Sequence, residues 1–223
     1  MKPYILLDTA TDHDSTLRLY QRGDEFSIRV DKAGELMNSR LHNSEDLLAD
    51  FACAHISGKS NTQMLVGGLG LGYTLAAALL HTGERSKVMV AELMPAVVRW
   101  NRSYLGTLAN HPLNNPRVEV HEQDVGKLMR EHKNNFDAIM LDVDNGPDAF
   151  TCHDNHLLYG LRGLQNAYNA LKPGGVLTVW SAVGSVDFTK RMQKTGFNVE
   201  EKRVRAHKNH TNSRHTIWIA SRS

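Results

Sequence analysis

The chain has 223 residues, of which 41% are hydrophobic and 22% are charged. These are the values of an ordinary globular protein, and the length suffices for one sizeable α/β domain with an appendage. The formal net charge of +2 argues against a general polyanion-binding surface, so nucleic acid is not an expected partner.

Cysteine usage and the apolar runs bear on the compartment. Cys53 and Cys152 lie far apart in the sequence and suit a reducing compartment better than a disulfide framework. The apolar run within residues 1–8 is short and is interrupted by an acid, unlike a signal peptide, and no stretch approaches the length of a membrane span. We therefore expect a cytoplasmic protein without a membrane partner.

The first part of the chain, residues 1–60, is expected to form a small antiparallel β appendage followed by a helix. Residues 17–21 and 26–30 alternate as half-buried strands do, and a turn then leads to residues 35–37. Asn43 and Ser44 are expected to cap a helix with one apolar face that ends near Gly58. A linker over residues 57–61 follows.

From Gln63 onward, segments typical of strands alternate with segments typical of helices. The alternation predicts a doubly wound, mostly parallel seven-stranded sheet of Rossmann-like type over residues 61–223, with the last two strands as an antiparallel hairpin at its edge. The expected strands are 64–66, 88–91, 117–121, 136–142, 176–180, 198–205 and 216–220. The expected helices are 71–81, one that begins at Pro95 and passes Trp100, 125–131, 157–171 and 186–195.

A glycine-rich loop between the first of these strands and its helix predicts a nucleoside site. Its glycines are Gly67, Gly68, Gly70 and Gly72. Glycine lets the backbone approach a ligand, the helix N-terminus offers N–H donors, and Glu92 at the end of the next strand can accept both ribose hydroxyls. A dinucleotide-binding loop would place glycine where this chain has Tyr73. The spacing instead resembles the first motif of class I S-adenosylmethionine-dependent transferases.

Acids and amides also follow the third and fourth predicted strands. Gln123 and Asp124 are expected to contact the adenine edge of the ligand. Asp142, Asp144 and Asn145 follow the fourth strand, nearest to where a reactive carbon would lie. An acid at a strand end is often only a helix cap or a turn residue, but three such positions in register with the glycine loop favour a binding site.

From Gln63 to Ser223 the chain resembles the spermidine and spermine synthase family, a branch of the class I methyltransferase fold. The matching pieces are 66–72 (VGGLGLG), 91–92 (AE), Asp124, 136–142 (FDAIMLD), 146–147 (GP), 158–159 (LY) and 171–176 (LKPGGV). The appendage and its helix are also similar to that family's N-terminal β domain. The resemblance implies an adenosyl sulfonium co-substrate, either S-adenosylmethionine or its decarboxylated form, and no metal.

Departures from the family pattern bear on the donor. Spermidine synthases carry an acid where this chain has Gly70, a Tyr-His pair where it has Asn43 and Ser44, and a second acid where it has Asn145. The missing acid weakens recognition of the amine of the decarboxylated donor, and a bare glycine loop is more compatible with a carboxylate. The sequence therefore favours ordinary S-adenosylmethionine.

The chemistry asked of the site is modest, because a sulfonium leaves as a neutral thioether without help from an acid. The protein must align the reactants and, for an amine acceptor, remove a proton from an ammonium whose pKa is about 10. Asp142 is the expected base or orienting group, assisted by Asp144 or Asn145. The main prediction is thus transfer of a methyl or aminoalkyl group to a small acceptor.

Three alternatives stay open: an RNA or protein methyltransferase that docks through the basic stretch 202–214, an aminopropyltransferase of polyamine biosynthesis, and a non-catalytic nucleoside-binding homologue. His207, His210 and His215 are interpreted as parts of a solvated loop, because their spacing fits no common metal site. His153 and its neighbours fall where the family has a gate over the acceptor, and Trp180 is expected in the core. The oligomeric state is open, with a homodimer as one option.

Overall fold

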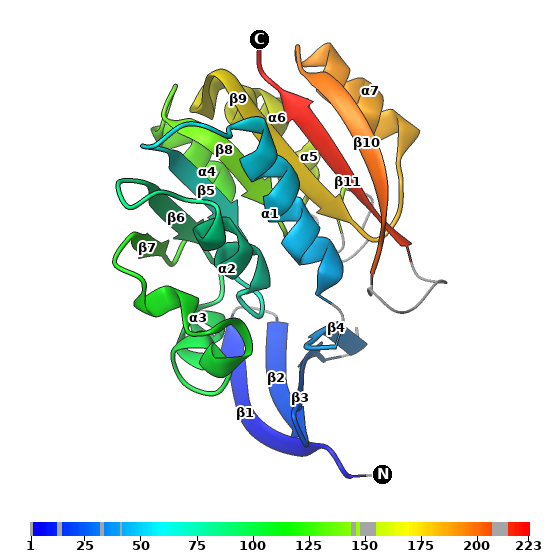
Figure 1. Cartoon of the computed structure of the whole chain (residues 1–223). Coiled ribbons are helices and arrows are strands. Elements are labelled where there is room, and N and C mark those ends of the chain that lie inside the picture. The colour runs from blue at the N-terminus through cyan, green and yellow to red at the C-terminus, as the bar shows by residue number, and fades with distance from the viewer. Residues whose placement is uncertain are drawn as a thin grey trace.

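The computed structural model describes residues 2–12, 15–31, 34–40, 42–143, 146–147, 155–206 and 214–223. Two sheets organise these residues: a small antiparallel sheet near the N-terminus and a large sheet with helices on both faces (Figure 1).

The large sheet has seven strands in the order β10-β11-β9-β8-β5-β6-β7. Strands β5 to β9 pair in parallel, whereas β11 pairs antiparallel with both β9 and β10. The predicted fold class, with its edge hairpin, is therefore confirmed. The strands are β5 (Gln63–Gly67), β6 (Lys87–Ala91), β7 (Val118–His121), β8 (Phe136–Leu141), β9 (Leu171–Ser181), β10 (Asn198–Arg205) and β11 (Arg214–Ser221).

The helices divide between the two faces of this sheet. They are α1 (Asn43–His55), α2 (Tyr73–Leu80), α3 (Pro95–Arg102), α4 (Val125–Glu131), α5 (Asn155–Tyr159), α6 (Leu161–Ala170) and α7 (Val186–Lys194), with 3-10 turns η1 (Gly106–Ala109) and η2 (Pro112–Asn114). Figure 1 shows α1 and α2 in front of the sheet. Successive side chains of β8 point to opposite faces of the sheet. Ala138 and Met140 belong to the core shared with α1, α2 and α3, whereas Ile139 and Leu141 belong to the core shared with α4 to α7.

The small sheet has the order β1-β2-β3-β4, all antiparallel. Its strands are β1 (Ile5–Asp12), β2 (Ser15–Arg22), β3 (Glu25–Val30) and β4 (Gly34–Asn38). Sequence patterning did not predict β1, whose Asp8 accepts a hydrogen bond from Nε1 of Trp100 on α3 at 2.7 Å. A partner so distant in sequence leaves no local signal.

Helix α1 lies against β8, β9 and α2, and so joins the layer that covers the large sheet. The expected caps were wrong: His42 occupies the N-cap position, and no side chain caps the helix. Asn43 instead donates through Nδ2 to the carbonyl oxygen of Arg205 at 2.7 Å, and Ser44 is buried. Their side chains are used in contacts with the far end of the chain, which local pattern could not predict. The domain boundary near residue 60 stays a prediction.

The helix expected over 157–171 is broken at Gly160, which separates α5 from α6. Gly163 allows the two helices to approach, because a Cβ there would lie 1.9 Å from the carbonyl oxygen of Leu158. Strand β9 then begins at Leu171, five residues earlier than the apolar run predicts.

Candidate active site

Strand order reverses between β5 and β8, and this is where open α/β sheets bind ligands beyond their carboxyl ends. The backbone N–H of Asp142 donates to the carbonyl oxygen of Gly67 at 2.8 Å, so the two strand ends are tied together. The structure thus brings the glycine loop and the acid after β8 to one edge, as the sequence predicts for parallel neighbours.

The loop after β5 has a backbone that only glycine adopts easily. Gly68, Gly70 and Gly72 have φ of +88°, +51° and +86°. A Cβ at Gly68 would lie 2.2 Å from the carbonyl oxygen of Asp142, so no other residue fits there. Gly72 is the residue before α2, so the loop opens directly into a helix N-terminus.

Glu92 follows β6 at the same edge and is buried, with 8% of its surface exposed. Its two carboxylate oxygens accept the N–H groups of Leu69 and Met94 at 2.9 and 2.8 Å. Burial raises the pKa of this carboxyl against the opposing effect of its backbone hydrogen bonds. The backbone N–H groups of Gly70 and Leu93 also act on this carboxylate, and its contact with ribose hydroxyls stays a prediction.

Gln123 and Asp124 follow β7, farther along the same edge. Asp124 is exposed and acts as the N-cap of α4, accepting the N–H of Lys127 at 2.8 Å. Gln123 is half-buried, and its backbone N–H donates to the carbonyl oxygen of His121. Contact of either side chain with adenine stays a prediction.

Asn101 was not predicted, and it supports the glycine loop from α3. Its Nδ2 donates to the carbonyl oxygens of Gly70 and Val97 at 2.8 and 3.0 Å. Its Oδ1 is buried, has no partner among the described residues, and faces Gly72 at 2.9 Å from where a Cβ would stand. An orphaned buried acceptor beside a bare glycine is a position where a ligand donor fits. A lone asparagine in a helix carries no sequence signal for this role.

Asp142 lies next to a second carboxyl group that the site prediction did not include. Oγ1 of Thr74 donates to Oδ2 of Asp142 at 2.8 Å, and burial raises the pKa of Asp142 to about 6. Burial and the negative charge of Asp142 raise the pKa of Glu45, in the first turn of α1, to about 8. The structure assigns neither carboxyl an ion pair with a described Lys or Arg, so ionisation of one carboxyl opposes ionisation of the other.

Ser44 links this pair to the C-terminal hairpin. The Ser44 hydroxyl lies 2.7 Å from Oε2 of Glu45 and 2.9 Å from Nδ1 of His215 on β11. The His215 ring meets the buried Trp180 edge to face at 4.7 Å. Trp180 thus lies in the core as predicted, whereas His215 lies in a buried contact and not in a solvated loop. That part of the sequence prediction was wrong.

Several predicted residues cannot be placed. Asp144, Asn145, His153, His207 and His210 lie outside the described residues. So does most of the basic stretch proposed as an RNA docking patch, residues 207–213. Gly146 is described, with φ of +95°, and packs where a Cβ would lie 2.3 Å from Oγ of Ser181 at the end of β9.

Strand β4 of the small sheet packs against the glycine loop through Met37. A Cβ at Gly70 would lie 3.3 Å from Sδ of Met37 on β4, and Tyr73 stacks on His42 with ring centroids 4.3 Å apart. The place of the missing family acid is therefore occupied by a thioether. An acid at position 70 would need Met37 to move.

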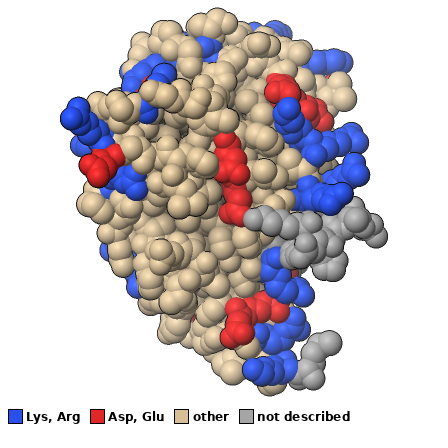
Figure 2. Space-filling view, viewed as in Figure 1, with Lys and Arg blue, Asp and Glu red and all other residues tan. Residues whose placement is uncertain are grey.

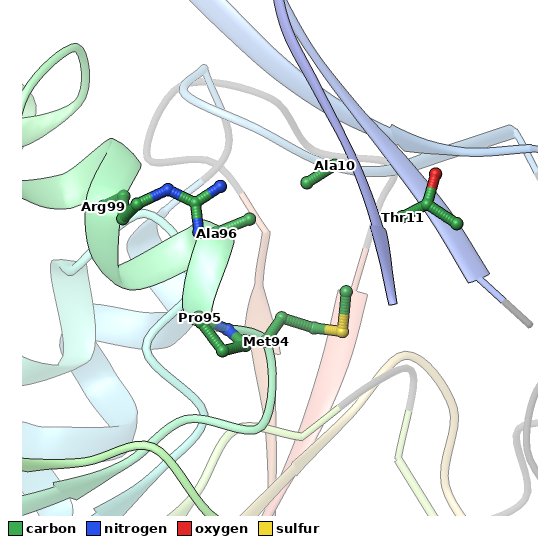
Figure 3. A pocket seen from close by; sticks show the side chains of 6 residues that line it. All are labelled: Ala10, Thr11, Met94, Pro95, Ala96 and Arg99. Atoms are coloured by element: carbon green, nitrogen blue, oxygen red, sulfur yellow. The ribbon is translucent and has the colours of Figure 1, made fainter. Parts of the chain in front are cut away.

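A hollow and two charged patches are further features of the surface, and the hollow is lined in part by Met94, which bonds Glu92. A hollow of about 360 Å³ lies between β1 and α3, and Figure 3 shows Ala10, Met94 and Arg99 around it. On the face in Figure 2, basic side chains gather beside β10 and acidic ones over α1. Across the described ranges, no three His, Cys, Asp or Glu side chains are grouped as metal ligands, and no helix is long and apolar enough to cross a membrane.

A family comparison identifies this arrangement. The sequence model of the spermine/spermidine synthase domain matches residues 45–201, which is most of the chain. The chain belongs to the spermine/spermidine synthase family. The glycine loop, Glu92, Asp124 and Asp142 all lie inside the matched segment, as does Glu45 at its first position.

Relatives of the family agree with this assignment. The polyamine aminopropyltransferase of Thermoanaerobacter sp. is 37% identical over 84 residues, which is 38% of this chain and 30% of that protein. Polyamine aminopropyltransferase 1 of Streptomyces coelicolor is 29% identical over 175 residues, 78% of this chain and again 30% of the relative. The matched segments thus span less than a third of these two proteins.

Solved structures of the family share the fold. Spermidine synthase from Thermotoga maritima superposes with a TM-score of 0.79 at 19% identity, covering 98% of this chain and 73% of that one. A probable spermidine synthase from Corynebacterium glutamicum gives 0.67 at 16% identity, covering 96% and 79%. The family relatives cited here are named for aminopropyl transfer or spermidine synthesis, so none supports the predicted option of methyl transfer.

Proposed function

We propose that this protein transfers an aminopropyl group from decarboxylated S-adenosylmethionine to a small amine acceptor. The observation that carries the proposal is the Glu45–Asp142 carboxyl pair beside the glycine loop, in a chain of the spermine/spermidine synthase family. Two carboxyl groups held close together, with hydroxyl donors and no described cation, form a site that an ammonium would stabilise strongly.

The residues around the loop fit the adenosyl part of the donor. The glycine loop runs directly into the N-terminus of α2, Glu92 lies at the same edge as the predicted partner of the ribose hydroxyls, and Oδ1 of Asn101 lacks a donor among the described residues. When bound, the donor supplies a sulfonium whose carbon is open to attack and whose thioether leaves neutral. Asp124 would reach the adenine edge from the end of β7.

Asp142 would serve as the base. With its pKa near 6, the carboxyl is ionised at neutral pH and can bind the acceptor ammonium, whose own pKa is about 10. It takes one proton, the freed nitrogen lone pair forms the new C–N bond, and the electrons of the broken C–S bond stay on sulfur. The product is a secondary ammonium, and each turnover releases one proton.

Gly70 is the observation that favours a different donor, ordinary S-adenosylmethionine with methyl transfer. An acid at this position would pair with the amine of the decarboxylated donor, and here Met37 lies against the glycine instead. In the proposed function, position 70 contributes no charge to the donor amine, and the Glu45–Asp142 pair holds the acceptor ammonium.

The experiment that tests the proposal compares donors and products. The protein is incubated with each donor and a panel of short α,ω-diaminoalkanes, and nucleoside products are separated by liquid chromatography. We expect methylthioadenosine, formed only with the decarboxylated donor and an acceptor. S-adenosylhomocysteine would indicate methyl transfer instead. Calorimetric binding of methylthioadenosine with no turnover on any acceptor would indicate the non-catalytic alternative.

A further inference from the structure

A fully buried serine connects Glu45 to a histidine from the other end of the chain. Ser44 has 0% exposure, and its Oγ lies within 2.7 Å of Glu45 and 2.9 Å of Nδ1 of His215. These residues come from the start of α1 and from β11. The contact therefore exists only because α1 packs across the edge hairpin of the large sheet.

The hydroxyl of Ser44 has one hydrogen, so it cannot donate to both neighbours at once. When Glu45 is ionised, Ser44 donates to the carboxylate and must accept from Nδ1–H of His215. When Glu45 is protonated, its O–H donates to Ser44, and Ser44 donates to a bare Nδ1. The tautomer of His215 is thereby tied to the charge of Glu45.

We propose that His215 is a positioning residue for the acceptor amine, which acts through Ser44 to stabilise the ionised form of Glu45. This inference rests on the proposed function, because the ammonium is what drives Glu45 to ionise. On acceptor binding, Glu45 loses its proton to solvent and the hydrogen on His215 moves from Nε2 to Nδ1. The Ser44 hydroxyl reverses direction, and a donor stays aimed at the new carboxylate.

The surroundings of both groups suit this exchange. Burial lowers the pKa of His215, so the ring changes tautomer without gaining a charge. Two histidines lie near Glu45: His42 contacts Asp46, and His215 contacts Ser44. The acidic groups linked to Glu45 by charge are Asp46 on its own helix, Tyr73 on α2 and Asp142 after β8. In their charged forms these acidic groups oppose ionisation of Glu45. A hydrogen bond donated by the Ser44 hydroxyl to the ionised Glu45 offsets part of that repulsion.

The first test reads the tautomer directly and needs no turnover. Protein labelled with ¹⁵N-histidine is followed by NMR through pH values around 8, where Glu45 titrates. We expect Nδ1 of His215 to be bare below this pH and to carry a hydrogen above it. The change should vanish in Glu45→Gln and Ser44→Ala and persist in Ser44→Thr. A His215 tautomer that stays constant in the wild type, or that switches equally in Glu45→Gln, overturns the inference.

The second test separates acceptor binding from donor binding. We expect Ser44→Ala and His215→Phe each to raise the KM of the acceptor about tenfold, the scale of one hydrogen bond to a charged group, with donor affinity unchanged. Ser44→Thr should restore the KM. Because both residues act in one chain of hydrogen bonds, the double variant should show little further loss. Additive losses, or a fall in kcat alone, would contradict the mechanism.

Matched controls exist elsewhere in the fold. Ser86 is a buried serine whose Oγ accepts from Thr62, and His132 is a partly buried histidine that contacts a backbone carbonyl and Phe136. Ser86→Ala and His132→Phe should leave the acceptor KM unchanged. If the wild type turns over no acceptor, the proposed function fails while the NMR result still tests the link. A constant tautomer in an active enzyme refutes the link alone.

Discussion

Replacing Asp142 by Asn separates the chemistry of the site from its folding. The amide keeps the size of the side chain and an oxygen that can accept from Thr74, which lies at 2.8 Å, but it removes the negative charge. In the folded protein the pKa of Asp142 is raised from 3.8 to about 6 by burial. Because the folded state holds this proton more tightly than the unfolded chain does, ionising Asp142 lowers stability as pH rises from about 4 to about 6.

The neutral variant should therefore be more stable than the wild type above pH 6. The difference between the two pKa values corresponds to a gain on the order of 1–3 kcal/mol in the free energy of unfolding. For a chain of this length, such a gain raises Tm by roughly 2–10 °C. Below about pH 4 both forms are neutral, and the gain should disappear. The pKa of Glu45 should also fall, because the charge that raises it is gone.

Turnover of the Asp142→Asn variant should fall, although its stability rises. Without a carboxylate to accept the ammonium proton, we expect turnover to fall by about 100-fold or more, the usual contribution of a general base, while donor affinity measured by calorimetry survives. Thermal unfolding at several pH values and the methylthioadenosine assay together check both statements. A variant that keeps full turnover, or that loses stability above pH 6, would show that Asp142 is a structural residue and move the catalytic assignment to Asp144.

Asp137, on the strand that Asp142 follows, offers a control in which the expected change in stability has the opposite sign. It is buried, and its carboxylate pairs with Lys172 and Lys59 at 2.6 and 3.0 Å, which hold its pKa below its usual range. A lowered pKa contributes stability that is present above the unfolded value and is lost as pH falls. Asp137→Asn should therefore lower Tm at neutral pH without the loss of turnover expected for Asp142→Asn.

Three further outcomes test other parts of the site. Glu92→Ala removes the predicted acceptor of the ribose hydroxyls and leaves two buried N–H groups without their partner, so donor affinity measured by calorimetry should fall at least about tenfold and Tm should drop. Gly70→Asp by itself should not improve binding of the decarboxylated donor, because φ at this position is +51° and Met37 lies in the way. The double variant Gly70→Asp with Met37→Ala should bind the decarboxylated donor more tightly than S-adenosylmethionine. Equal affinities of the double variant for the two donors would contradict this. The pH profile of kcat/KM for the acceptor should rise through about 6 as Asp142 ionises and again near 8 as Glu45 does, and a profile that shows a single rise or none over this range would refute the carboxyl pair.

Much of the large sheet was predictable because its signals are local. A local signal marks each of these segments. An apolar run leads from Met64 into the glycine loop, another apolar run precedes Asp142, and Asp124 caps the helix over 125–131. Parallel strands place their carboxyl ends at one edge, so residues after different strands are expected to meet. By that rule the sequence predicts that the glycine loop, Glu92 and Asp142 lie at one edge.

Other elements were decided only by tertiary contacts. The Asp8 side chain on strand β1 accepts a hydrogen bond from Trp100, and Asn43 and Ser44 leave their expected capping role for partners on β10 and β11. In each case the partner lies far away in the sequence, so no local pattern indicates the contact.

The sequence by itself determined the fold class and the edge of the sheet where the glycine loop, Glu92 and Asp142 lie, because these follow from periodicity and from residues close together in the chain. The tertiary structure alone decided that Glu45 faces Asp142 and that Ser44 reaches His215, a residue 171 positions away. Carboxyl pKa values depend on burial and on neighbouring charges, and both are properties of the packed molecule. A pattern along the sequence therefore does not predict these pKa shifts.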